Sequence, residues 1–169
     1  SLAYRNQTIG DANITASSLD MKDFIEETYS KGKENLDSLA LDSNVQMLNI
    51  TEFGSLGNER VWDSIVWNLP YPPNTPLAGH PEGNALMTGF FQKMSQILKP
   101  DGFIYITLCD HQQGDNSQWD LEGFAWNNKL AVTEVSSFYD SNITGYAPKL
   151  VYKDEEIPEY DCLTYVIRL

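Results

Sequence analysis

The chain has 169 residues, of which 41% are hydrophobic and 12% aromatic, and its formal net charge is -13 at pH 7. This length predicts a single domain, residues 1–169, with enough apolar side chains to bury a core. No apolar run reaches the roughly 18 residues that cross a membrane, and nothing at the start resembles a signal peptide, so no membrane partner is expected. Eleven basic residues against twenty-four acids give a surface that repels nucleic acid as a whole.

The chain contains only two cysteines, Cys109 and Cys162. They are too few for a disulfide framework, and neither has the neighbours of a zinc site. We therefore predict two reduced thiols in a soluble, intracellular protein, and no metal site.

Strands and helices are predicted to alternate along the first half of the chain. The expected elements are a strand over residues 13–18, a helix over 21–41, a strand over 45–50 and a strand over 61–67. Gly32 is expected to bend or interrupt the helix. The last of these strands ends at about Asn68, because Pro70 and the three prolines that follow it cannot donate to a sheet ladder.

The second half of the chain contains the best-supported helix. Its apolar face is formed by Leu86, Phe90, Phe91, Met94, Ile97 and Leu98. The Lys-Pro-Asp-Gly sequence at residues 99–102 is expected to end it. A doubly buried strand over 103–108, a weaker helix over 117–129 and strands over 131–138 and 160–169 follow. This order predicts an α/β fold, a Rossmann-like doubly wound and mainly parallel sheet whose last two strands can pair antiparallel at an edge.

Ligands of such sheets bind outside the carboxyl ends of the strands, and this rule selects the candidate site residues. Four strand ends qualify: Asp20, Asn49, the segment 68–71 and the segment 109–111. A carboxylate after the first predicted strand is suited to ribose hydroxyls, because it accepts two hydrogen bonds. Asp20 could equally be the N-cap of the helix that follows it.

The sequence Asn68-Leu69-Pro70-Tyr71 is the sharpest of these signals. The asparagine side chain and the carbonyl before the proline offer acceptors for a planar base edge, and the tyrosine ring can stack on that base. The alternative is a rigid turn without a ligand. No general base stands out, and Asp110 and His111 are candidates only through their position at a strand end.

Several segments, in their order, resemble one family. They are ITASSLD, KGKENLDSL, WDSIVWNLP, GFFQKMSQILKPDGFIYITL, Trp119 and the pair Gly145-Tyr146. The chain resembles class I S-adenosylmethionine-dependent methyltransferases, and among them the Rossmann-like domain of the eukaryotic 25S ribosomal RNA uridine-N3 methyltransferase family, up to about Lys149. The resemblance implies S-adenosylmethionine as the cofactor and methylation of an RNA base as the activity.

The same resemblance implies the roles of single residues. Asp20 would hold the cofactor ribose, and Asn49 with Ile50 would lie beside the adenine. Asn68, Leu69, Pro70 and Tyr71 would form the catalytic turn, with Asn68 also facing the cofactor. Two positions depart from the family's pattern: Asn49 stands where aspartate is usual, and Cys109 where lysine is common.

A glycine-rich cofactor loop after a first, central strand is also expected from the family, immediately before a Ser-Leu-Ala sequence. This chain starts at Ser1-Leu2-Ala3. We therefore expect the first strand and the loop to be missing from the given sequence, as in a piece of a longer protein, since a sheet without its central strand leaves backbone groups unpaired.

Three functions follow as hypotheses. The first is a methyltransferase acting on RNA, with uridine-N3 of large-subunit ribosomal RNA as substrate and the nucleolus or nucleus as location. The second is a catalytically silent, methyltransferase-like scaffold, which the acidic charge and the absent loop favour. The third is a small-molecule methyltransferase, which accounts for the acidity and retains the chemistry.

Overall fold

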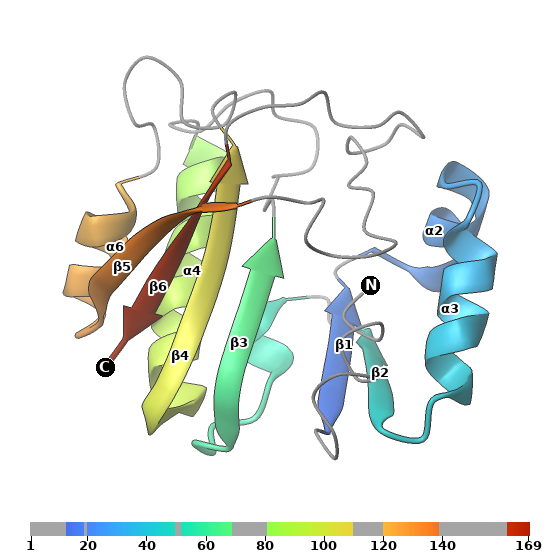
Figure 1. The fold of residues 1–169 in the computed structure, drawn as a ribbon, viewed down its shortest axis with the longest axis horizontal. Helices are drawn as coiled ribbons and strands as arrows, with labels where there is room; N and C mark the ends of the chain where they lie inside the picture. Colours follow the sequence, from blue (N-terminus) through green and yellow to red (C-terminus); the bar gives the residue numbers. More distant parts are fainter. Residues whose placement is uncertain (1–12, 19, 50–51, 69–80, 110–119, 139–161) are drawn as a thin grey trace. The chain divides into compact units, whose positions relative to one another are not determined.

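The computed structural model describes residues 13–18, 20–49, 52–68, 81–109, 120–138 and 162–169, and the structural statements below concern these residues. They fall into two compact units, which Figure 1 shows in one picture and which are described separately. The first unit takes its described residues from 13–55, and the second from 56–138 and 162–169. The prediction of one domain stays a prediction.

A βαβ arrangement forms the first unit. Strand β1 (Ile14–Ser18) is followed by helices α2 (Lys22–Thr28) and α3 (Gly32–Leu41), strand β2 (Val45–Asn49) and the 3-10 turn η2 (Phe53–Ser55). The two strands pair in parallel, from Ile14 opposite Val45 to Ser18 opposite Asn49. The predicted strands are therefore confirmed to within one residue at each end.

Gly32 divides the predicted helix into two. It is the first residue of α3, and its backbone N–H donates to the Tyr29 carbonyl at 2.7 Å. A Cβ atom at this position would overlap the backbone carbonyl of Ile25 in α2. The close approach of the two helices therefore requires glycine here, and the expected interruption at Gly32 is confirmed.

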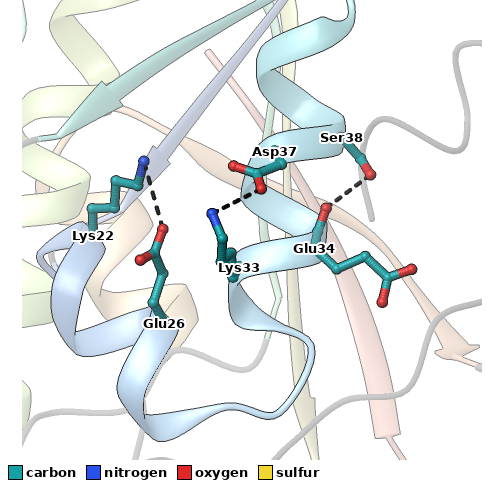
Figure 2. Close-up of polar contacts among 6 residues, drawn as sticks. All are labelled: Lys22, Glu26, Lys33, Glu34, Asp37 and Ser38. Atoms are coloured by element: carbon teal, nitrogen blue, oxygen red, sulfur yellow. Dashed lines mark hydrogen bonds and ion pairs between the residues drawn. The ribbon is translucent and has the colours of Figure 1, made fainter.

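Figure 2 shows the polar contacts that run along α2 and α3. Lys22 Nζ lies 3.5 Å from Glu26 Oε1, and Lys33 Nζ lies 3.0 Å from Asp37 Oδ2, each pair at the i, i+4 spacing. The Ser38 hydroxyl donates to the Glu34 carbonyl at 2.8 Å. These contacts are local to each helix. The Lys33–Asp37 pair stabilises α3 only modestly, because its charges face water, whereas Glu26 Oε1 in α2 is buried without a hydrogen-bond partner.

The second unit is built on a four-stranded sheet. Its strands are β3 (Trp62–Asn68), β4 (Leu98–Cys109), β5 (Ala131–Phe138) and β6 (Cys162–Arg168), in the order β3-β4-β6-β5. β3 and β4 are parallel, whereas β6 runs antiparallel to both β4 and β5. The mixed α/β class and the antiparallel pairing of the last two strands are confirmed, with β6 inserted between β4 and β5 and β5 at the edge.

Helices α4 (Pro81–Ile97) and α6 (Leu121–Asn127) supply the other half of the core of this unit. The Trp67 ring of β3 lies 4.2 Å from the Phe90 ring of α4, and Phe91 stacks on Phe124 of α6 at 6.0 Å between centroids. The largest fully buried side chains are Phe91, Met87, Ile97, Leu98, Ile104, Ile106, Leu108, Leu130, Ile167 and Thr107. Of the apolar face predicted for α4, Phe90, Phe91, Met94 and Ile97 are buried in this core, while Leu86 is only half-buried and Leu98 contributes from β4.

The predicted end of α4 was wrong in one respect. Leu98 and the segment 99–102 belong to β4, which begins directly after Ile97. Leu98 pairs with Trp62, and the register then shifts before Phe103 pairs with Ser64. Such an irregularity lets the strand pass through Pro100. A Cβ atom on Gly102 would lie 3.0 Å from the carbonyl oxygens of Trp62 and Asp63, so a larger residue here would require β3 to shift slightly.

The prediction of two reduced thiols was also wrong. Cys162 is disulfide-bonded, and its partner in the strand register is Cys109, the only other cysteine of the chain. Directly opposite positions on adjacent antiparallel strands bring Cβ atoms to about 4.5–5.5 Å, close to the separation that a disulfide requires. The argument from reduced thiols to an intracellular location therefore loses its support. No helix in the described part of the chain is long and apolar enough to cross a bilayer.

Candidate functional site

The carboxyl ends of β1 and β2 lie side by side, because the two strands are parallel and in register. Ser18 is opposite Asn49, and Asp20 follows two residues after Ser18. The first unit therefore brings the backbone positions of two of the four predicted cofactor residues, Asp20 and Asn49, to one end of its sheet. Ile50 lies outside the described residues, and Asn68 belongs to the second unit.

Asp20 is partly buried at this edge. Its backbone N–H donates to the Ser18 hydroxyl at 3.0 Å, which turns the chain after the strand. Burial raises the pKa of its carboxyl group above the usual value of 3.8, because the charged form loses water. The N-cap position of α2 is Met21, and no side chain caps this helix. The alternative role of Asp20 as an N-cap was therefore wrong.

The chemistry of this carboxylate suits a ribose. A partly desolvated carboxylate is stabilised by hydroxyl donors, and two neighbouring hydroxyls match its two oxygens. This observation makes Asp20 compatible with the ribose of S-adenosylmethionine, the role expected from the sequence.

Asn68 is the last residue of β3, where the sequence predicted the strand to end. Thr107 lies directly opposite on β4, and its hydroxyl donates to Asn68 Oδ1 at 3.0 Å. Thr107 is only 1% exposed. Leu69, Pro70 and Tyr71, the rest of the predicted catalytic turn, lie outside the described residues, as do Asp110 and His111.

A third polar side chain continues this contact. Thr164 of β6 is opposite Thr107 in the register, and the two hydroxyl oxygens are 3.0 Å apart. We call Asn68, Thr107 and Thr164 the polar row. Sequence reasoning missed both threonines. The available signal was Thr107 itself, the one polar residue besides Tyr105 in the buried run 103–108.

Two surface hollows in the described residues lie away from these positions. One, of about 510 Å³, is lined by α6 and β5 residues that include Asp120, Trp126 and Leu130. The other lies on α3 and includes Lys33 and Leu41. Neither is lined by Asp20, Asn49 or Asn68, so the strand ends, and not these hollows, remain the candidate site.

The comparison with known families decides the class of the protein. Residues 1–150 match the BMT5-like family model, described as rRNA (uridine-N3-)-methyltransferase BTM5-like. The chain belongs to the BMT5-like family. The resemblance stated from the sequence is thereby confirmed over almost the same span.

Relatives and solved structures agree with the family's fold. An uncharacterised protein of Arabidopsis thaliana is 27% identical over 173 residues, covering 91% of this chain and 79% of that protein. An S-adenosylmethionine-dependent methyltransferase of Aquifex aeolicus matches with a TM-score of 0.58 at 17% identity, covering 99% of this chain and 76% of that one. The Burkholderia thailandensis 1,6-didemethyltoxoflavin-N1-methyltransferase, bound to its substrate and S-adenosylhomocysteine, matches with a TM-score of 0.54 at 11% identity, covering 92% and 60%.

As a member of the BMT5-like family, the chain is an S-adenosylmethionine-dependent methyltransferase. The enzyme class and the cofactor expected from the sequence are confirmed at this level. The Rossmann-like fold is confirmed by the solved methyltransferases. The roles of the individual residues stay predictions.

Proposed function

We propose that this BMT5-like methyltransferase methylates N3 of uridine in large-subunit ribosomal RNA. The observation that carries the proposal is the family match over residues 1–150. The reaction forms a bond from N3 to the methyl carbon while the C–S bond of the sulfonium donor breaks, and the N3 proton passes to water. S-adenosylmethionine supplies an activated methyl group, so the protein has mainly to bind, orient and exclude water.

In this proposal, residues at the strand ends hold the cofactor and the target base. Asp20 binds the cofactor ribose, and Asn49 with Ile50 lies beside the adenine. Asn68, Leu69, Pro70 and Tyr71 face the methyl group and the target base. The partly buried carboxylate of Asp20 and the anchored amide of Asn68 support these assignments. An enzyme of ribosomal RNA acts in the nucleolus or nucleus, where we place it.

A small-molecule substrate is the second candidate, and the net charge of -13 favours it. Binding to RNA requires cations that offset phosphate charge, and this chain has an excess of acids. A small neutral or cationic substrate needs no such cations.

The deciding experiment maps methylated nucleosides. Ribosomal RNA from cells with the gene deleted is incubated with purified protein and isotope-labelled S-adenosylmethionine, and 3-methyluridine is measured by mass spectrometry. We expect labelled 3-methyluridine with the wild type and none with Asp20→Ala, whose cofactor binding is measured by calorimetry. Unlabelled RNA together with a labelled small metabolite would contradict the first proposal and support the second. Absence of cofactor binding by the wild-type protein would contradict both.

A further inference from the structure

The polar row fixes the direction in which the Asn68 side chain can donate. Its three members come from adjacent strands, β3, β4 and β6, at paired positions of the register. The sheet register therefore keeps the three backbone positions next to one another, within reach of a side-chain hydrogen bond. Thr107, at the centre, is 1% exposed, so bulk water does not reach it and its buried hydroxyl needs a partner within the protein.

The number of hydroxyl hydrogens determines the direction of hydrogen-bond donation along the polar row. Each threonine hydroxyl carries one hydrogen, and Thr107 uses its own to donate to Asn68 Oδ1. The 3.0 Å contact between the two hydroxyls must then use the hydrogen of Thr164. The order of donation is therefore Thr164 to Thr107 to Asn68.

This direction of donation determines which atoms Asn68 presents to a ligand. With Oδ1 turned to Thr107, the Nδ2 group and its two hydrogens lie on the other arm of the amide. Asn68 can thus offer the two Nδ2 hydrogens as donors beyond the row, whereas the sequence had suggested only an acceptor. A donor pairs with a carbonyl oxygen of a base and does not pair with an exocyclic amine.

We propose that Thr107, completed by Thr164, is a positioning residue that holds Asn68 as a hydrogen-bond donor to a carbonyl oxygen of the target base. This inference rests on the proposed function and deepens it by naming the class of base. Uracil N3 lies between two carbonyl groups, and loss of its proton spreads negative charge onto both oxygens. A fixed N–H donor binds that charged form more tightly than the neutral base, which favours the transition state. Adenine, whose edge has an amine and no carbonyl, is disfavoured, whereas cytosine keeps one carbonyl, O2, beside its N3.

The first test uses kinetics on the full chain. RNA oligonucleotides with one uridine, guanosine, adenosine or cytidine are methylated with labelled S-adenosylmethionine. Thr107→Val removes the hydroxyl at nearly constant shape, and we expect kcat on uridine to fall about 10-fold with the cofactor Kd changed by less than about two-fold. Thr107→Ser, which keeps the hydroxyl, restores most of kcat. Asn68→Asp keeps the shape but only accepts, so we expect a loss of about 100-fold or more.

The outcomes separate this inference from the proposed function. Methylation of guanosine N1 in place of uridine would overturn the uridine proposal and support the donor role, because guanine also presents a carbonyl. Methylation of an adenine or cytosine amine would overturn both. Asn68→Asp as active as wild type on uridine would overturn the inference alone.

A second measurement does not depend on turnover. NMR of the labelled Asn68 carboxamide is compared between wild type and Thr107→Val, with melting temperatures measured in parallel. Loss of an accepted hydrogen bond moves the carbonyl carbon resonance and leaves the amide nitrogen nearly in place. A shift of the nitrogen with an unchanged carbon would show that Asn68 donates to Thr107, and would overturn the inference whatever the substrate.

Discussion

The two units of the chain differ in how their strands are covered. All buried hydrophobic residues among those described belong to the second unit, from Met87 to Ile167. In the described part of the first unit, Gly32 is the only buried residue. A parallel pair of strands is normally covered on both faces, and two strands alone are marginal in water. The stability of the first unit therefore depends on more than its described elements, whereas the second contains its own core.

The difference matters for the two halves of the reaction. Asn68 accepts a hydrogen bond from Thr107 of the neighbouring strand β4, and Thr107 is in turn contacted by Thr164 of β6. Asp20 is held at the end of a two-stranded sheet, with its backbone bonded to Ser18. The proposed substrate residue is thus fixed by long-range packing, and the proposed cofactor residue by a local turn.

Removal of a large core side chain is expected to have the largest effect. Phe91 is fully buried against Phe90 and Phe124, so Phe91→Ala should lower the free energy of unfolding by about 3–5 kcal/mol. Denaturant unfolding measures this, and hydrogen exchange locates the lost protection in residues 81–109. Leu41→Ala is the control in the first unit, where the side chain is 87% exposed and a change within about 0.5 kcal/mol is expected. Equal effects of the two substitutions would contradict the contrast between the units.

Loss of the disulfide should have the second largest effect on stability. Cys162→Ser is expected to destabilise the second unit by about 2–4 kcal/mol, since the bond restricts the unfolded chain. Reductant should lower the melting temperature of the wild type and leave that of the variant unchanged. If reductant has no effect on the wild type, the disulfide does not form in solution.

Asp20 provides a prediction that separates stability from binding. Because burial raises its pKa in the folded chain, its ionisation opposes folding: the stability present below pH 3.8 is lost as pH rises through the raised pKa. Asp20→Asn should therefore melt higher than the wild type at neutral pH and equally at low pH. Its affinity for S-adenosylmethionine should fall about 10- to 100-fold, the cost of a charged hydrogen-bond acceptor.

Calorimetry of S-adenosylmethionine binding across the acidic pH range tests the role of Asp20 in binding. Wild-type affinity should increase as Asp20 ionises, while the affinity of Asp20→Asn stays flat. A variant that binds as tightly as the wild type at neutral pH would remove Asp20 from the site.

The smallest effect is expected at the surface of the second unit. Lys99 Nζ lies 2.7 Å from Asp63 Oδ1, but the Asp63 side chain is 79% exposed. Asp63→Asn should cost about 0.2–1 kcal/mol, and less as salt increases. A double-mutant cycle with Lys99→Met isolates the coupling energy of the ion pair. A coupling energy as large as the loss of unfolding free energy expected for Phe91→Ala would show that surface charge, not burial, distinguishes the units.

Local patterns in the sequence were sufficient for most elements and for single strand ends. The apolar spacing of α4, the stop at Asn68 and the break at Gly32 each depend on neighbouring residues. Pairings between distant strands were not accessible, because register is set by the whole sheet. The bond of Thr107 to Asn68, the disulfide of Cys162 and the continuation of β4 through Pro100 all depend on it. The same limit explains why Asn68 was expected to accept and not to donate.

The position of β6 has a consequence for the order of events during synthesis. β6 follows β5 in the chain, yet it lies between β4 and β5. While the ribosome is still making residues 162–168, β4 has only β3 as a neighbour, and β5 has none in the sheet. Thr164 also arrives with this strand, so Thr107 acquires its second partner last. A nascent chain that stalls before residue 162 would thus carry Thr107 without the hydroxyl that sets its direction of donation to Asn68.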